Sequence, residues 1–148
     1  SADLQKVIDA LSAADGVILV SPVFQASYSG LFKSAMDVLP AGTLEGVPVL
    51  LGATAGTARH SLVTEMALRP LVVYMKALPA QTAVFAASED FGAAWQTPSS
   101  SERPESPLSE RMARAGRELA ALMERFPRQA PIDPLADFAP MEALLAGR

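Results

Sequence analysis

Three short apolar runs, separated by longer segments with helical spacing, constrain the fold of this chain more than any other feature. The runs cover residues 17–20, 47–54 and 82–87. Their aliphatic and branched residues follow one another without polar alternation, which is typical of strands buried on both faces of a parallel sheet. Ser21 and Pro22 are expected to end the first strand, because proline cannot donate to the hydrogen-bond ladder of a sheet.

The segments between these runs repeat apolar residues at the three- and four-residue spacing of helices. Asp3 and Ser29 are expected to cap the first two helices. Pro70 is expected to kink the third helix or to lie in the first turn of its second half. Helices are predicted over residues 3–14, from Ser29 to Leu39, from Ser61 to Leu78 and from Pro107 to Phe126. The alternation of helices and buried strands predicts an α/β fold with a doubly wound parallel sheet.

The length of 148 residues fits one domain. Residues 1–126 are expected to form it, with residues 97–107, rich in serine and proline, as a mobile loop whose Ser106 caps the next helix. Residues 127–148 are expected to dock on the domain or on a second chain, because they carry too few apolar residues to fold alone. These apolar residues are Phe138, Met141, Leu144 and Leu145.

Composition excludes several classes of function. A net charge of -4 and a pI near 4.9 give no electrostatic case for nucleic acid or an anionic membrane as the main partner. The chain has no cysteine and one histidine, which excludes disulfides and thiol catalysis and argues against zinc sites with two or three histidines. No apolar stretch is long enough to span a membrane and the first residues do not resemble a signal peptide, so a cytoplasmic protein is expected.

Ligands of such sheets bind beyond the carboxyl ends of the strands, which points to the loops 21–30 and 54–61. The first loop contains Phe24 and Tyr28, a glycine (Gly30) that allows close backbone approach, and the free amides of a helix start. The alternative interpretation is an ordinary strand-to-helix turn with two half-buried aromatic residues.

The second loop contains Gly56, which permits unusual backbone dihedral angles, and Thr57, which can cap the following helix. It also contains His60, the single histidine. The alternative here is a polar loop residue that titrates normally. Neither loop carries the glycine spacing of a dinucleotide fingerprint or of a P-loop.

The first loop and the start of the helix after it carry Pro22, Phe24, Ser27, Ser29, Gly30 and Lys33, and the second loop carries Thr54, Gly56, Thr57 and His60. In these positions the two loops resemble those of the NAD(P)H-dependent FMN reductase family, and the resemblance covers roughly residues 4–90. Within this family, the sequence most resembles the reductases that serve flavin-dependent monooxygenases of the luciferase-like type. The segment DFAPMEALLAG is similar to the C-terminal extension of that subgroup.

The resemblance implies a flavodoxin-like, three-layer α/β/α fold with strand order 2-1-3-4-5, in which the three runs are strands 3, 4 and 5. The first βαβ portion, with the phosphate loop of the family, is missing from this sequence. Without it residues 17–20 would leave a bare apolar sheet edge, which natural proteins avoid. A preceding portion of at least about 30 residues is therefore expected before Ser1.

The resemblance also implies that FMN binds with its isoalloxazine ring between the loops and receives a hydride from NAD(P)H at N5. Backbone amides of residues 22–28 would lie near N5 and O4, and those of Gly56 and Thr57 near N1 and the C2 carbonyl. Phe24 and Tyr28 would pack at the ring or at the nicotinamide pocket, with no catalytic acid or base and no metal. The implied cofactor-binding residues are Pro22, Val23, Phe24, Gln25, Ser27, Tyr28, Gly30, Thr54, Ala55, Gly56, Thr57 and His60.

Two other functions stay open. The same fold serves quinone, azo-dye and chromate reductases, and a non-enzymatic electron-transfer or interaction module that has lost the phosphate site would also fit. The segment 61–78 is apolar over most of its circumference, which favours a homodimer or homotetramer. A charged residue at Val72 or Met75 is expected to disturb that assembly.

Overall fold

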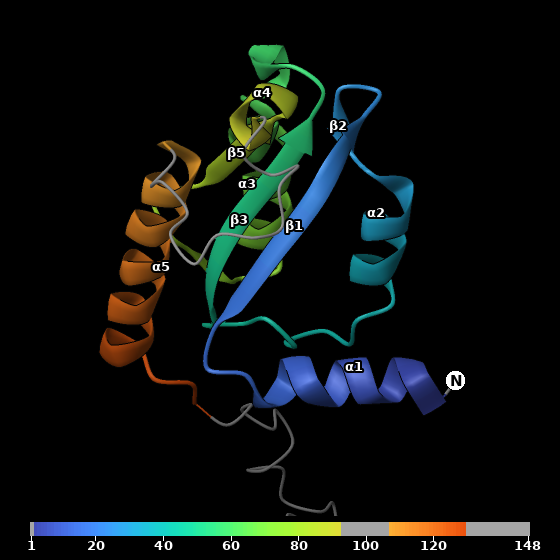
Figure 1. Cartoon of the computed structure of the whole chain (residues 1–148). Coiled ribbons are helices and arrows are strands. Elements are labelled where there is room, and N and C mark those ends of the chain that lie inside the picture. The colour runs from blue at the N-terminus through green and yellow to red at the C-terminus, as the bar shows by residue number, and fades with distance from the viewer. Residues whose placement is uncertain (1, 93–106, 130–148) are drawn as a thin grey trace, which may run out of the picture.

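The computed structural model describes residues 2–92 and 107–129, which form helices on both faces of a central sheet (Figure 1). The α/β class predicted from the sequence is confirmed. The helices are α1 (Ala2–Ala13), α2 (Gly30–Asp37), the 3-10 turn η1 (Ala58–His60), the π-helical turn η2 (Thr64–Leu68), α3 (Arg69–Tyr74), α4 (Ser88–Phe91) and α5 (Pro107–Arg125). The strands are β1 (Val17–Phe24), β2 (Ser27–Tyr28), β3 (Pro48–Ala55), β4 (Leu78–Pro79) and β5 (Val84–Ala87).

The three predicted runs form three neighbouring parallel strands. β3 lies in the centre, with β1 on one side and β5 on the other. The short strand β4 pairs with the first two residues of β3, and β2 pairs antiparallel with the end of β1. The sheet is therefore mixed but mostly parallel.

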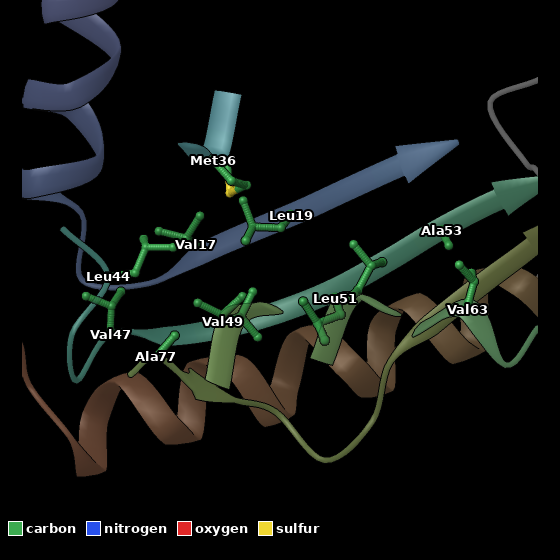
Figure 2. Packing of buried hydrophobic residues seen from close by; sticks show 12 residues of the cluster. Val17, Leu19, Met36, Leu44, Val47, Val49, Leu51, Ala53, Val63 and Ala77 are labelled. Carbon is green, nitrogen blue, oxygen red and sulfur yellow. The ribbon is translucent and has the colours of Figure 1, made fainter. Parts of the chain in front are cut away.

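The larger core lies between the sheet and the helices α2, η2 and α3 (Figure 2). On this face the alternate residues of β1 and β3 point toward the helices, and α5 covers the opposite face around Leu50. The buried residues of the larger core include Val17, Leu19, Met36, Val49, Leu51, Val63, Leu68 and Val72. Helices thus lie on both faces of the sheet, and α5 covers the part of its face around β3 and β5.

The prediction that the first strand is buried on both faces is wrong. Val17 and Leu19 are buried, but Ile18 is 59% and Val20 is 55% exposed. In the described part of the chain, α5 lies mainly against β3 and β5, and a hollow of about 300 Å³ with apolar walls lies beside these side chains. Within the described residues, positions 17–22 of β1 pair with β3 alone, which leaves the other edge open.

The prediction that Ser21 and Pro22 end this strand is also wrong. β1 continues to Phe24, and Pro22 stays in register with Thr54 of β3. Proline is tolerated there because edge strands leave one row of backbone groups unpaired.

The helix predicted from Ser61 to Leu78 is divided and shorter. The amide of Arg69 donates to the carbonyl of Thr64 in the π-helical turn, and Pro70 lies in the first turn of α3 as predicted. The helix ends at Tyr74, because Lys76 adopts a φ of 60°. The amide of Ala77 donates to Val72 O at 3.0 Å, which is the pattern of a Schellman C-cap.

Two other helix boundaries differ from the prediction. Asp3 lies inside α1, where it pairs with Lys6, and does not cap the helix. α2 ends at Asp37, before the predicted Leu39. α5 begins at Pro107 as predicted, whereas Ser106, most of the predicted loop 97–107 and residues 130–148 lie outside the described residues. In the described part of the chain, no helix is both long and apolar enough to cross a membrane.

Candidate functional site

The two predicted loops lie side by side at one end of the sheet (Figure 1). Pro22 of β1 pairs in register with Thr54 of β3, and Thr54 pairs with Ala86 of β5. The carboxyl ends of all three parallel strands therefore meet at the same edge. The expectation that the fold brings these loops together is confirmed.

The first loop is a tight hairpin between β1 and β2. Phe24 pairs with Ser27, and the two residues between them, Gln25 and Ala26, have φ values of 49° and 63°. Two consecutive positive values are those of a type I′ turn, where glycine or asparagine is usual. The turn therefore stores backbone strain at the strand end, which is a recurrent property of functional sites.

Two serines join the hairpin to α2. The amide of Ser29 donates to Ser21 Oγ at 2.9 Å, and the amide of Phe32 donates to Ser29 Oγ at 3.1 Å. Ser29 caps the helix as predicted, and the first amides of α2, at Gly30 and Leu31, have no intrahelical partner. Sequence reasoning missed Ser21, whose one signal was a serine directly after an apolar run.

The two aromatic residues of the hairpin differ in their surroundings. Phe24 is 61% exposed at the strand end. Tyr28 is half-buried and lies against Phe32, with ring centroids 5.8 Å apart and an interplanar angle of 41°. The ring of Phe24 is thus available to a ligand, whereas the ring of Tyr28 packs against the protein.

The second loop follows β3 and turns through η1. Thr57 occupies the N-cap position but makes no side-chain cap hydrogen bond, so the predicted cap is wrong. Gly56 does not adopt a positive φ, so it needs no unusual dihedral angle. His60 ends η1 and is exposed.

The glycines of both loops face open space. A Cβ atom added at Gly30 or Gly56 would meet no heavy atom within 4 Å. The loops 21–30 and 54–61 contain no aspartate or glutamate, and Arg59 lies in the second. The backbone is therefore accessible to a flat ligand, and the residues present fit a ring that becomes electron-rich on reduction.

The two loops form two walls of the candidate site, and the segment after β5 forms a third wall that was not predicted. After β5 the chain turns into α4, where Asp90 Oδ2 accepts from the amide of Ala87 at 2.8 Å. Arg111 of α5 donates to Asp90 Oδ1 at 2.8 Å and to the carbonyl of Phe85 at 3.1 Å. The hydrogen bond from Arg111 and the one from Ala87 lower the pKa of Asp90. The polar residues after the third apolar run were the one available signal.

Comparison with known proteins places the chain among flavin reductases. The family model described as NADPH-dependent FMN reductase matches residues 1–92. An FMN reductase (NADPH) of Pseudomonas aeruginosa is 42% identical over 61% of this chain and 48% of its own length. The NADH-dependent FMN reductase SfnF of Pseudomonas putida is 43% identical over 62% of this chain and 49% of its own length. The chain thus spans about half the length of the curated relatives that it matches.

Two solved structures have a similar fold. An oxidoreductase from Corynebacterium diphtheriae has a TM-score of 0.71 and 47% identity, over 84% of this chain and 64% of the other. The apo form of the NADH:FMN oxidoreductase EMOB has a TM-score of 0.67 and 26% identity, over 87% of this chain and 63% of the other. Since the family model covers more than half of the sequence, the chain belongs to the NADPH-dependent FMN reductase family.

Proposed function

We propose that the strand-end site binds the isoalloxazine ring of FMN and that the whole protein reduces FMN with NAD(P)H. The observation that carries this proposal is the register of Pro22 with Thr54, which joins two carboxylate-free loops whose glycines face open space. The names of the similar proteins, which are FMN reductases and an NADH:FMN oxidoreductase, support it.

Within this proposal each loop has a distinct task. Phe24 packs against the ring, and the hairpin backbone donates hydrogen bonds to one ring edge. The amides of Gly56 and Thr57 lie at the other edge, where His60 adds a polar contact. The remaining proposed contacts are those of Pro22, Val23, Gln25, Ser27, Tyr28, Gly30, Thr54 and Ala55.

Bound FMN would accept a hydride from NAD(P)H at its N5 atom. The chain's own residues hold the ring, exclude water from one face and stabilise negative charge through backbone amides. Hydride transfer to the ring would require no acid or base from the protein.

We further propose that the first βαβ portion of the same fold covers the open edge of β1 in the whole protein and supplies the FMN phosphate site. The exposed Ile18 and Val20 beside an apolar hollow support this proposal, since a bare apolar edge promotes association. The longer relatives, about twice the matched length, also support it. The expected boundary at residue 126, between the domain and its C-terminal extension, also remains a proposal.

The proposed assembly is a homodimer or homotetramer built on the outer face of η2 and α3. Met66 and Val73 are exposed there, and so is Leu62, which lies just before η2. The expectation that a charge at Val72 would disturb assembly needs correction, because Val72 is fully buried in the core and a charge there would disturb folding first. A flavin-dependent monooxygenase as the acceptor of reduced flavin and a cytoplasmic location also remain proposals.

The test of the function is oxidation of NADH and NADPH by the whole protein, followed by absorbance, with FMN, a quinone or no acceptor present. The proposal expects oxidation that depends on FMN and saturates with it. Faster oxidation with the quinone would favour the quinone reductase alternative. Flavin binding without oxidation of either nucleotide would favour the non-enzymatic electron carrier.

A further inference from the structure

A second concave surface lies at the opposite end of the molecule from the strand-end site. It is a groove of about 550 Å³ between the C-terminal halves of α2 and α3 and the segment 39–45, which precedes β3. Its apolar lining comprises Met36, Leu39, Pro40, Leu71, Tyr74 and Met75. We call this surface the basal groove.

The polar groups at the basal groove are already matched to one another. Lys33 pairs with Asp37 at 2.6 Å, and Lys76 pairs with Glu45 at 3.0 Å. The apolar residues are less well covered, and Tyr74 is 86% exposed. The groove is therefore suited to apolar side chains and offers no unpaired charge to a small ionic ligand.

Arg128 brings the end of the described chain to the wall of this groove. Its guanidinium donates to the carbonyls of Leu11 and Ala14 at the end of α1, both at 2.9 Å. It also donates to the carbonyl of Thr43 at 2.9 Å, and Thr43 lines the groove. Carbonyls at a helix C-terminus attract a cation, so this contact fixes the point from which residues 130–148 depart.

We propose that the C-terminal segment 130–148 of the same chain occupies the basal groove. The segment repeats apolar residues at three-residue spacing, and acidic residues lie between them. A benzene-sized group needs a cavity of about 150 Å³, so the groove has room for two or three such side chains. The apolar residues are Ile132, Leu135, Phe138, Met141, Leu144 and Leu145.

The departure point favours the chain's own segment over that of a second copy. A segment fixed at Arg128 has to close a loop of a few residues to reach the groove, and short loops cost little entropy. Its effective concentration at the groove is in the millimolar range, which a separate molecule does not reach at ordinary protein concentrations. The segment would join α2 to α3 at the ends opposite the two loops of the strand-end site.

The absence of cysteine from the sequence makes a clean test possible. One variant carries Ala41→Cys in the groove wall and Ala139→Cys beside Phe138. The control variant carries Ser88→Cys, exposed on α4 at the other end of the sheet, with the same Ala139→Cys. Both are oxidised under identical conditions, and products are separated on non-reducing gels and weighed by mass spectrometry.

The proposal expects the groove pair to form an intrachain disulfide at least tenfold faster than the control pair. Adding Phe138→Asp is expected to bring that rate down to the control rate. Equal rates for the two pairs would overturn the proposal. A product with twice the mass of the chain would also overturn it, since the occupant would then come from a second copy. Amide hydrogen exchange of the unmodified chain gives an independent check: Phe138→Asp should increase exchange in residues 39–45 and 71–77, and unchanged exchange would contradict the proposal.

Discussion

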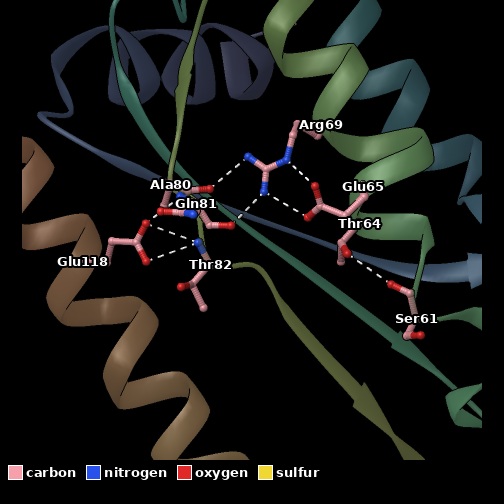
Figure 3. A network of polar contacts seen from close by, with 8 residues as sticks. All are labelled: Ser61, Thr64, Glu65, Arg69, Ala80, Gln81, Thr82 and Glu118. Carbon is pink, nitrogen blue, oxygen red and sulfur yellow. Dashed lines mark hydrogen bonds and ion pairs between the residues drawn. The ribbon is translucent and has the colours of Figure 1, made fainter.

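Arg69 and Glu118 hold the same turn, residues 80–82, from helices on opposite faces of the sheet (Figure 3). Arg69 binds backbone carbonyls of the turn, and Glu118 binds its backbone amides. Arg69 donates to the carbonyls of Ala80 and Gln81 at 2.9 and 3.1 Å. Glu118 accepts from the amides of Gln81 and Thr82 at 2.5 and 3.2 Å. The turn leads into β5, so this clamp fixes the strand that carries the third wall of the site.

The first prediction concerns the pH dependence of this clamp. Hydrogen bonding to Thr82 lowers the pKa of Glu118. A carboxylate with a lowered folded pKa stabilises the protein above its ordinary value of about 4.3, and this contribution is lost as the pH falls through the folded value. Glu118→Gln should lower the free energy of unfolding by about 1 kcal/mol at pH 7 and by much less at pH 3.

Urea unfolding of both proteins at several pH values measures this difference. Glu124→Gln, at an exposed position on the same helix, is the control and should leave the free energy of unfolding nearly unchanged. A loss for Glu118→Gln that is equal at pH 7 and pH 3 would show that the charge of Glu118 is not what stabilises the turn.

The second prediction concerns strain in the hairpin. Ala26 has a φ of 63°, which costs an alanine roughly 1–2 kcal/mol relative to the right-handed region. Ala26→Gly removes this cost but adds chain entropy to the unfolded state, so a net stabilisation of about 0.5 kcal/mol is expected. Ala35→Gly in α2, where the backbone is helical, should instead destabilise by about 1 kcal/mol. Thermal unfolding distinguishes the two, and equal destabilisation would refute the strained turn.

The third prediction concerns room for the flavin. A methyl group at Gly56 meets no protein atom within 4 Å, so Gly56→Ala should fold normally. The methyl group would occupy the space assigned to the ring, and FMN affinity should fall at least tenfold. Gly116→Ala on α5 meets no atom either and lies outside both loops, so its affinity should match that of the parent chain. Quenching of FMN fluorescence measures the FMN affinity of the parent chain and of both variants. An unchanged affinity for Gly56→Ala would exclude this loop from the site.

The fourth prediction concerns assembly. Met66 is 76% exposed on η2, and Met66→Glu should shift the whole protein toward monomer without loss of secondary structure. Val7→Glu places the same charge on the exposed side of α1 and should leave the oligomeric state unchanged. Sedimentation velocity gives the answer, and identical profiles for parent and Met66→Glu would exclude this face as an interface.

The order of strands and helices could be predicted from the sequence, because each apolar run is short and each helix has a clear apolar spacing. The burial of β1 could not, since it depends on how far α5 extends over the sheet. Ile18 and Val20 are apolar, yet α5 leaves them exposed. Sequence periodicity carries no information about which neighbour covers a strand.

The meeting of the two candidate loops at one sheet edge could be predicted from the sequence. The hairpin was missed because Gln25 and Ala26 are not the residues that usually adopt positive φ values. The third wall was missed because Arg111 and Asp90 lie far apart in the sequence and meet through the packing of α5. Such contacts follow from tertiary structure and leave no local pattern.

An NMR titration of the ¹⁵N-labelled chain with FMN, at up to millimolar concentration, shows directly where the flavin binds. Such concentrations detect binding even without a complete phosphate site. The largest amide shift changes are expected in residues 23–31 and 54–60, because Pro22 has no amide proton. The basal groove and the outer face of α5 should stay unchanged. Shift changes confined to other regions, or none at saturating FMN, would contradict the claim that the two strand-end loops form the flavin site.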